Sequence, residues 1–287
     1  GLGLRGLARA LRGAWPDHVI AVERGLLAAR LMGVGGRKFA AGPVNPRRAR
    51  ALGAQDTLAG LARRGRGTVL PEGPATDDVA AVVFTSGATG PAKGVVYRHG
   101  QIEANRDALV TLYGITEADR LVAAFAPFAL YGPAMGITSV VPHMDVTQPG
   151  SLTATGLADA VAAVSATLVW ASPATLRNVV ATDAELSADD RRALAGVRLL
   201  MSAGAPVPSE LLHSVVALMP GAEAHTPYGM TEVLPVADAD LAQIDKAGAG
   251  EGVCVGTPVT DVLVAISALD ADGHATGELD DAPGITG

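Results

Sequence analysis

One segment of the chain, residues 85–94 (TSGATGPAKG), constrains its structure more than any other. It combines three hydroxyl side chains, three glycines and one lysine, and it directly follows an apolar run at 78–85. Glycines let backbone N–H groups approach an anion closely, hydroxyls donate further hydrogen bonds, and lysine adds a compact positive charge. We therefore expect a strand-to-helix loop at 85–94 that holds phosphate groups.

The neighbouring residues exclude two other glycine motifs. A Walker loop has glycine before its lysine and Ser or Thr after it, whereas Ala92 precedes Lys93 and Gly94 follows it. The elbow of serine hydrolases has glycine two residues before its serine, but Phe84 stands two residues before Ser86. An ordinary glycine turn has little use for so many hydroxyls and a lysine, so phosphate binding is the favoured interpretation.

Strand-like and helix-like segments alternate along the chain beyond residue 78. The helical spacing at 101–113 stops at Gly114, a typical residue after a helix. This alternation predicts an α/β fold in which helices cover layered, largely parallel sheets. The predicted strands are 78–85, 121–125, 167–171, 197–201 and 222–226, and the predicted helices are 101–113, 176–180 and 208–219.

Residues 1–75 form a basic N-terminal segment in which helices and strands are harder to assign. Residues 1–70 hold 13 Lys and Arg against 3 Asp and Glu, whereas the remaining 217 residues hold 9 against 26. Aromatic residues make up only 3% of the chain and do not alternate with the basic ones, which argues against nucleic-acid binding. We interpret this N-terminal segment as having a solvated, arginine-rich surface and helices at 26–32 and 48–63. A linker at 71–78 follows.

Apolar and metal-ligating residues exclude further classes of protein. No run of about 20 uncharged apolar residues occurs, so no transmembrane segment is predicted. The single cysteine, Cys254, cannot form an internal disulfide and is expected to be a small buried side chain. The six histidines show no metal-binding spacing, and His225 is expected to be structural. These features fit a cytoplasmic protein.

Two further motifs accompany the phosphate segment. Tyr228-Gly229-Met230-Thr231-Glu232 matches the pattern YGxTE, and residues 202–206 (SAGAP) follow a predicted strand. Together with residues 85–94 they resemble the signatures of the adenylate-forming superfamily, which includes acyl-CoA synthetases, luciferases and peptide-synthetase adenylation domains. Two departures from the signatures are Ala92 at a usual proline position and Ala203 at a usual glycine position.

This resemblance implies a fold, ATP and Mg²⁺, and a set of site residues. The fold would be the large N-terminal α/β domain of the superfamily, in incomplete form. Tyr228 would stack on adenine, Thr231 would bond the α-phosphate, and Glu232 would bind Mg²⁺. The catalytic residues would be Thr85, Lys93, Thr231 and Glu232. The ATP-binding residues would be Thr85, Ser86, Gly87, Thr89, Gly90, Lys93, Gly204, Ala205, Pro206, Tyr228, Gly229 and Thr231.

The resemblance covers roughly residues 80–280. We expect residues 76–287 to be the nucleotide-binding core and residues 1–75 to represent part of the superfamily's N-terminal region. The ribose-binding aspartate motif, the hinge and the small C-terminal domain of the superfamily are not found in the sequence. Two interpretations stay open, namely part of an active ligase and a non-catalytic nucleotide-binding fragment.

The acid that would be activated is suggested by three apolar segments. Residues 125–136 lack the histidine that many acyl-CoA synthetases carry near 128–131. With residues 142–145 and 170–173, this stretch resembles the β-lactone synthetases of bacterial long-chain olefin biosynthesis. That resemblance implies a long-chain β-hydroxy fatty acid as substrate, a β-lactone product and partner enzymes of the same pathway. The alternative is a long-chain fatty acyl-CoA synthetase, which would also use coenzyme A.

Overall fold

A computed structural model describes residues 16–84, 94–248, 252–272 and 274–280. The chain divides into two compact units, 1–100 and 101–287. Among the described residues, no helix combines the length and the apolar character needed to cross a bilayer. The sequence predicts a boundary near residue 75 between the N-terminal region and the nucleotide-binding core. This functional boundary stays a prediction.

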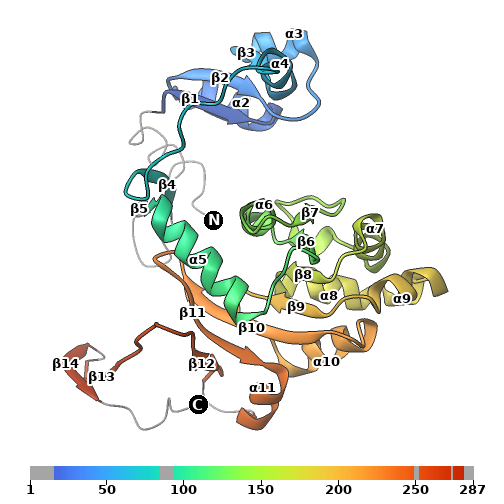
Figure 1. Ribbon diagram of the computed structural model, residues 1–287, viewed down its shortest axis with the longest axis vertical. Coiled ribbons are helices and arrows are strands. Elements are labelled where there is room, and N and C mark those ends of the chain that lie inside the picture. Colours follow the sequence, from blue (N-terminus) through green and yellow to red (C-terminus); the bar gives the residue numbers. More distant parts are fainter. Residues whose placement is uncertain (1–15, 85–93, 249–251, 273, 281–287) are drawn as a thin grey trace. The chain divides into compact units, whose positions relative to one another are not determined.

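The first unit contains a small α/β assembly at residues 16–66 (Figure 1, blue). Its three strands are parallel in the order β1-β2-β3, and its core is a cluster of four buried side chains, Leu26, Ala40, Ala49 and Ala54. The predicted helix at 26–32 is confirmed as part of α2. The elements are β1 (His18–Ala21), α2 (Glu23–Leu31), β2 (Arg37–Ala40), α3 (Pro46–Ala51), β3 (Ala54–Thr57) and α4 (Leu58–Arg64).

The single helix predicted at 48–63 is wrong, because the segment holds two helices with strand β3 between them. Gly53 adopts a left-handed backbone with a φ of 83°, which ends α3. The next residue, Ala54, pairs with Lys38 of β2. Long-range strand pairing therefore overrides the local helical pattern.

The phosphate-loop segment lies between two strands. β4 (Val79–Phe84) and β5 (Gly94–Arg98) are antiparallel, and Phe84 pairs with Gly94. Residues 85–93 lie outside the described residues. The predicted strand-to-helix connection is wrong, because the segment joins two paired strands and α5 begins only after β5. The linker expected at 71–78 contains no helix or strand.

The second unit is organised around a seven-stranded sheet in its described part, with the order β12-β11-β10-β9-β8-β6-β7. Strand pairs from β7 to β10 are parallel, whereas β10, β11 and β12 pair antiparallel. This is the predicted α/β fold with a largely parallel sheet. The strands are β6 (Arg120–Ala124), β7 (Thr138–Val140), β8 (Leu168–Ala171), β9 (Leu199–Ser202), β10 (Glu223–Met230), β11 (Val233–Asp240) and β12 (Thr257–Pro258). A separate hairpin is formed by β13 (Ile266–Leu269) and β14 (Ala275–Asp280).

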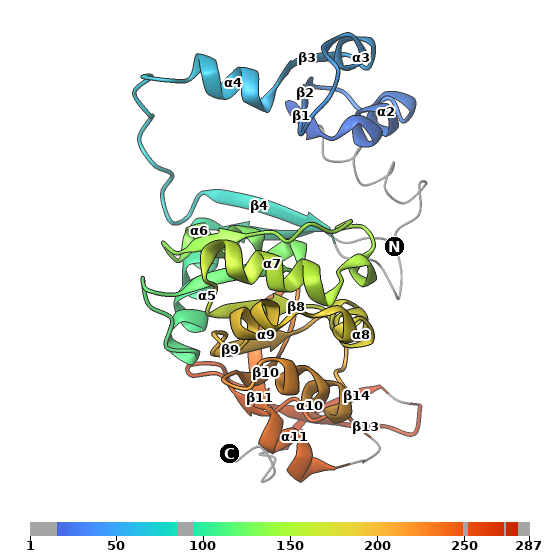
Figure 2. The ribbon, with the colours of Figure 1, turned by 90° about the vertical axis from the view of Figure 1, so that its right-hand side faces the viewer.

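Helices cover both faces of this sheet. Helices α7 to α10 lie together on one face (Figure 2), and α5 and η1 contribute to the apolar cluster on the other. Predicted elements at 101–113, 121–125, 167–171, 176–180, 197–201 and 208–219 are confirmed as α5, β6, β8, α8, β9 and α10. The helices are α5 (His99–Leu112), α6 (Tyr131–Ala134), α7 (Ala154–Val164), α8 (Pro173–Ala181), α9 (Ala188–Leu194), α10 (Ser209–Leu218) and α11 (Leu241–Ala247), with 3₁₀ turns η1 (Ala126–Leu130), η2 (Pro149–Ser151) and η3 (Asp183–Glu185).

An ion pair between a buried carboxylate and a partly exposed guanidinium joins the amino ends of three parallel strands. Asp119, Thr167 and Arg198 directly precede β6, β8 and β9. Both carboxylate oxygens of Asp119 accept hydrogen bonds from Arg198, at 2.8 and 2.7 Å, and Oδ1 accepts another from the Thr167 hydroxyl at 2.7 Å. The bonds from Arg198 hold the pKa of Asp119 well below its usual range, against the opposing effect of burial.

We predict that Asp119→Asn lowers the free energy of unfolding by about 1–2 kcal/mol at pH 7, because the buried carboxylate loses its charge-assisted hydrogen bonds while Arg198, whose side chain is 41% exposed, remains partly solvated. The folded-state pKa of Asp119 is depressed, so its stabilisation is complete above the unfolded pKa of about 3.9 and is lost as pH falls below it. Urea unfolding at pH 7 and at pH 3 measures both effects, and the difference from wild type should shrink at pH 3.

The matched control is Asp189→Asn, which removes the exposed ion pair to Arg192. We expect a change below about 0.5 kcal/mol for this control, because exposed pairs contribute little. Equal losses in the two variants would contradict the special role of Asp119.

Candidate functional site

The YGxTE motif lies at the end of the β10–β11 hairpin. The predicted strand at 222–226 continues to Met230, so Tyr228 and Gly229 stand within β10. Met230 pairs with Val233, and Thr231 and Glu232 form the turn between the two strands. Antiparallel pairing with β11 therefore extends the strand beyond the local apolar run.

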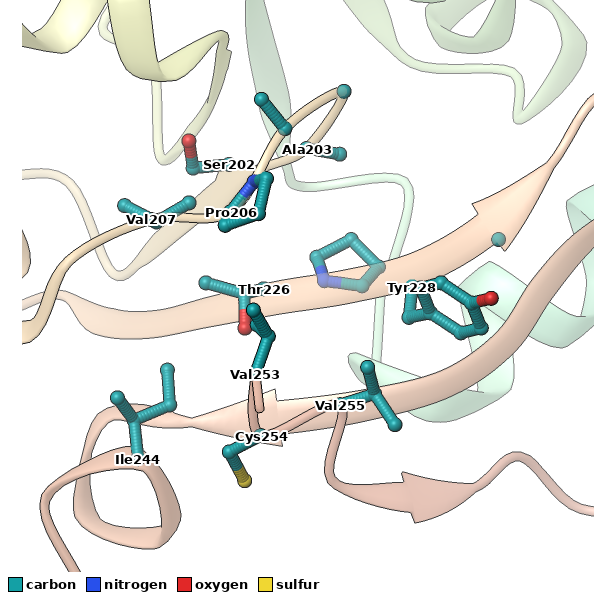
Figure 3. A pocket seen from close by; sticks show the side chains of 14 residues that line it. Ser202, Ala203, Pro206, Val207, Thr226, Tyr228, Ile244, Val253, Cys254 and Val255 are labelled. Atoms are coloured by element: carbon teal, nitrogen blue, oxygen red, sulfur yellow. The ribbon is translucent and has the colours of Figure 1, made fainter. Parts of the chain in front are cut away.

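A cavity of about 400 Å³ lies beside this hairpin (Figure 3). The loop at 202–207 forms one wall, residues 226–229 of β10 form the second, and Ile244 of α11 with residues 253–255 forms the third. Drug-sized ligands and cofactors bind in pockets of about 300–1,000 Å³ that are mostly apolar with a few polar groups. The cavity is large enough for a nucleoside monophosphate by this measure.

Five of the residues predicted to bind ATP line this one cavity: Gly204, Ala205, Pro206, Tyr228 and Gly229. They come from two segments more than 20 residues apart in sequence. The loop at 204–206 follows the carboxyl end of β9, the sheet edge at which α/β proteins bind ligands. Their assignment to ATP stays a prediction.

The other predicted residues do not line the cavity among the described residues. Thr231 is half-buried and Glu232 is exposed in the adjoining turn. Thr85, Ser86, Gly87, Thr89, Gly90 and Lys93 lie outside the described residues.

Close backbone approach requires glycine at two positions beside the cavity. A Cβ atom at Gly229 would lie 2.6 Å from Leu234 Cδ2 and 2.9 Å from the Val233 carbonyl oxygen. A Cβ atom at Gly256, where φ is 77°, would lie 1.8 Å from the carbonyl oxygen of Asp238. At these two glycines the backbone packs directly against β11. The contacts position the wall formed by β10 and the wall that contains residues 253–255.

A buried polar network supports the hairpin. Asp238 of β11 accepts a hydrogen bond from the Tyr113 hydroxyl at 2.9 Å and contacts His225 Nδ1 at 2.6 Å. Burial alone lowers the pKa of His225, but the hydrogen bond and the charge of Asp238 outweigh it and raise the pKa overall. Burial and the same negative charge raise the pKa of Tyr113. These contacts fit the structural role expected for His225, which stays a prediction.

The apolar segment at 125–136 contributes to an aromatic cluster. Phe128 stacks on Trp170 of β8 with ring centroids 3.6 Å apart, and Phe125 and Tyr131 flank it at 5.4 and 5.1 Å. Phe128 and Trp170 are almost completely buried. This cluster lies on the face of the sheet that α5 covers.

Sequence reasoning did not assign Thr226, Ile244 or the segment at 253–255 to the site, although residues 252–258 (GVCVGTP) resemble a further glycine-rich block of the superfamily. Cys254 was expected to be buried, but it is half-buried on the wall of the cavity, with its thiol 4.0 Å from the Gln243 carbonyl oxygen. A strand-like VCV stretch between glycines gives no local signal of a cavity, because β12 brings it there by pairing with β11.

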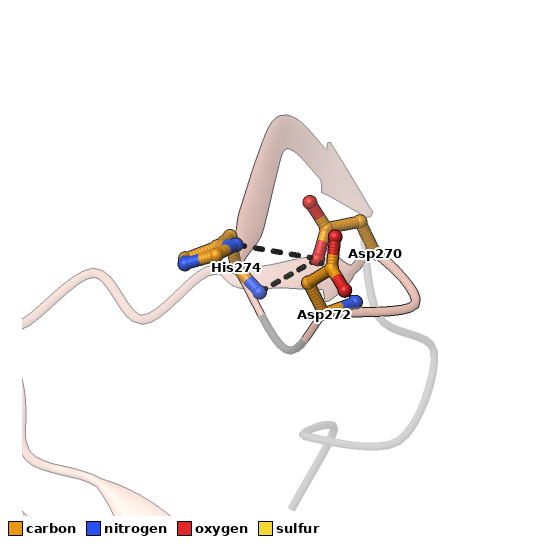
Figure 4. Close-up of side chains that lie close together, drawn as sticks. All are labelled: Asp270, Asp272 and His274. Atoms are coloured by element: carbon orange, nitrogen blue, oxygen red, sulfur yellow. Dashed lines mark hydrogen bonds and ion pairs between the residues drawn. The ribbon is translucent and has the colours of Figure 1, made fainter.

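One group of potential metal ligands lies at the β13–β14 turn (Figure 4). Asp270, Asp272 and His274 are exposed. Asp270 Oδ1 accepts backbone hydrogen bonds from Asp272 at 3.0 Å and His274 at 2.8 Å, which stabilises the turn. These hydrogen bonds explain why the three side chains lie close together, as part of the turn and without a metal ion.

Curated relatives match most of the chain. It is 39% identical to an olefin beta-lactone synthetase of Xanthomonas campestris pv. campestris over 94% of this chain and 48% of that protein. An olefin beta-lactone synthetase of Stenotrophomonas maltophilia is 38% identical over 75% of this chain and 38% of that protein. The chain thus spans about half or less of the length of these relatives. A feruloyl-CoA synthase of an Amycolatopsis species is 29% identical over 66% of this chain.

Solved structures share the fold. A putative long-chain-fatty-acid CoA ligase from Rhodopseudomonas palustris has a TM-score of 0.69 at 18% identity, covering 96% of this chain and 65% of that one. A malonyl-CoA ligase with methylmalonyl-CoA and AMP bound has a TM-score of 0.60 at 26% identity, covering 93% and 63%. A profile of the family described as AMP-binding enzyme matches residues 34–282. The chain belongs to the AMP-binding enzyme family, that of the adenylate-forming enzymes.

Proposed function

We propose that this chain forms the nucleotide-binding part of a ligase that uses ATP to activate a long-chain β-hydroxy fatty acid as an acyl-adenylate, which then closes to a β-lactone. The observation that carries the nucleotide assignment is the single cavity lined by both the 204–206 loop and the Tyr228-Gly229 pair. The β-lactone assignment is supported by the 38% and 39% identity to olefin beta-lactone synthetases.

The proposed nucleotide contacts follow from the side chains and backbone of the cavity. The Tyr228 ring, which is 43% exposed, offers a π face to a purine. The backbone of the loop at 204–206 offers donors and acceptors to its polar edge. The hydroxyl of Thr231, in the adjoining turn, would donate to the α-phosphate, and Thr85, Ser86, Thr89 and Lys93 would hold the outer phosphates.

The residues at the hairpin turn fit Mg²⁺. Glu232 offers an exposed carboxylate next to the strand that lines the cavity. Mg²⁺ is commonly held by one or two carboxylates together with substrate phosphates and water, so one carboxylate is sufficient here. When bound, the ion neutralises charge on phosphate oxygens.

Two bond exchanges make up the proposed reaction. A carboxylate oxygen of the acid attacks the α-phosphorus of ATP, and pyrophosphate leaves. The β-hydroxyl oxygen then attacks the acyl carbon, the bond to AMP breaks, and the hydroxyl proton is released. The hydroxyl is already tethered to the acyl group, so ring closure needs no second substrate.

The first test concerns the cavity. We expect Gly229→Ala to weaken binding of AMP or MgATP about 10- to 100-fold, because overpacking of about 1–3 kcal/mol would displace the hairpin. Isothermal titration calorimetry measures the Kd. Gly35→Ala is the control, because a Cβ atom at Gly35 has no neighbour within 4 Å. An unchanged Kd in a folded Gly229→Ala variant would refute the assignment of this cavity.

The second test concerns the metal. In the complete protein that contains this chain, Glu232→Gln should slow pyrophosphate release by about 10²- to 10³-fold, because a charge-stabilising group is lost. Glu210→Gln, on the exposed start of α10, should leave the rate unchanged. Wild-type rates for Glu232→Gln at saturating Mg²⁺ would exclude Glu232 as a ligand.

The third test concerns the product. With ATP, Mg²⁺ and a long-chain β-hydroxy fatty acid, the complete protein should form a β-lactone without coenzyme A, detected by mass spectrometry as the acid minus one water. Formation of an acyl-CoA thioester only when coenzyme A is added would instead identify a fatty acyl-CoA synthetase.

A further inference from the structure

The strand that forms one wall of the candidate nucleotide cavity is paired on only one side where it lines that cavity. β10 pairs with β9 from Glu223 to His225, and beyond that point it pairs with β11 alone among the described residues. The cavity-lining residues 226–229 follow directly. The pairing with β11 also shifts register between Tyr228 and Met230. Backbone pairing therefore holds this part of β10 less firmly than it holds the start of the strand.

A side-chain contact reinforces β10 at the point where it leaves β9. His225 Nδ1 lies 2.6 Å from Asp238 Oδ2 on β11, and the Tyr113 hydroxyl donates to Oδ1 of the same carboxylate at 2.9 Å. An ionised carboxylate only accepts hydrogen bonds, so Nδ1 carries the hydrogen of this contact. Asp238 is 8% exposed, and a buried carboxylate that loses a partner is left uncompensated. The contact thus joins β10 and β11 to the residue that follows α5.

This contact lies directly beside the cavity wall. Asp238 pairs with Pro227 across the hairpin. Residues two apart in a strand project from the same face, as do residues directly opposite each other in an antiparallel pair. His225, Pro227 and Asp238 therefore share one face of the hairpin. Pro227 lines the cavity and has no backbone N–H group to donate to a neighbouring strand, so the side-chain contact anchors β10 where a backbone donor is missing.

The groups around His225 favour its protonated form. Burial alone lowers the pKa of His225 from its ordinary value of 6.5, but the hydrogen bond and charge of Asp238 outweigh burial and raise the pKa overall. The charges of Asp240 and Glu223 act in the same direction, and a carboxylate oxygen of Glu223 lies 4.0 Å from His225 Nε2. Tyr113 presents a neutral hydroxyl and a ring whose centroid is 5.2 Å away. The residue of β9 that pairs with His225 is uncharged.

We propose that His225 is a positioning residue for nucleotide binding: its contact with Asp238 holds the cavity-lining part of β10 in the arrangement that accepts a purine, and the contact is strongest when His225 is protonated. This inference rests on the proposed function, because it concerns the affinity of the cavity assigned there to the nucleotide. A hydrogen bond from an imidazolium to a carboxylate is stronger than one from a neutral imidazole. Loss of the proton should therefore loosen the cavity wall and weaken purine binding.

The test is the pH dependence of adenosine binding to the complete protein, measured by isothermal titration calorimetry between pH 6 and pH 9. Adenosine has no phosphate that titrates in this range, so a change in Kd reports on the protein. The folded-state pKa of His225 is raised, so the contact is strong below the unfolded value of about 6.5 and weakens as pH rises through the folded-state pKa. We expect the wild-type Kd to increase about three- to tenfold, the effect of weakening one charge-assisted hydrogen bond.

His225→Gln separates the charge from the hydrogen bond. The amide keeps a donor for Asp238 and does not titrate, so the Kd of this variant should stay constant with pH and lie near the wild-type value at pH 9. A side chain with a purely structural role would change stability and leave this pH profile as it is in wild type. His225→Ala, which also removes the donor, should bind adenosine more weakly than His225→Gln at every pH.

His274→Gln is the matched control. His274 also pairs with an aspartate, Asp270, at 3.7 Å, but this pair is exposed at the β13–β14 turn. The variant should keep the wild-type pH dependence of adenosine binding.

Reciprocal linkage gives a second readout. If protonation of His225 strengthens adenosine binding, adenosine must raise the pKa of His225, by about 0.5–1 for a three- to tenfold change in Kd. Nuclear magnetic resonance titration of the imidazole signals measures this pKa with and without adenosine. The signal that is absent from His225→Gln identifies His225.

Three outcomes would overturn the inference. These are a wild-type Kd that does not change with pH, the wild-type pH profile in folded His225→Gln, and a pKa of His225 that adenosine leaves unchanged. Each can be distinguished from failure of the proposed function, which would appear as no binding of adenosine to wild type at any pH.

Discussion

The ion pair between Asp119 and Arg198 is the constraint on which the second unit depends. Through Thr167 it connects the starts of β6, β8 and β9, three neighbouring parallel strands. Arg198 also donates to the backbone oxygens of Tyr113 and Gly114 at 3.3 and 3.2 Å. These are carbonyl groups at the end of α5, which would otherwise lack partners. One guanidinium thus fixes both the register of the sheet and the position of the helix that covers it.

The same helix end connects this sheet edge to the candidate site. The Tyr113 hydroxyl binds Asp238, which also contacts His225 and lies opposite Pro227 in the β10–β11 pairing. Pro227 is followed by Tyr228, whose ring lines the cavity. Hydrogen bonds therefore connect the ion pair to Asp238 through Tyr113, and strand pairing places Asp238 opposite Pro227, which lines the cavity.

Local patterns predicted the fold where strands and helices are long and apolar, as in β6, β8, β9, α5 and α10. They failed where a short strand carries polar or charged side chains, as in β2 and β3. β2 contains Arg37 and Lys38 and becomes a strand only between β1 and β3. Helix α7 was not predicted either, because five of its 11 residues are alanines, whose small side chains occupy buried and exposed positions alike. For the candidate site, motifs identified Gly204 and Tyr228, whereas Ile244 lies on α11 and has no local signature.

The central claim is that the complete protein forms an enzyme-bound acyl-adenylate. The most direct measurement is exchange of labelled pyrophosphate into ATP in the absence of coenzyme A. We expect exchange that depends on both Mg²⁺ and a long-chain β-hydroxy fatty acid, because pyrophosphate attack on the acyl-adenylate reverses its formation. An absence of acid-dependent exchange, with ATP converted instead to ADP and phosphate, would contradict it.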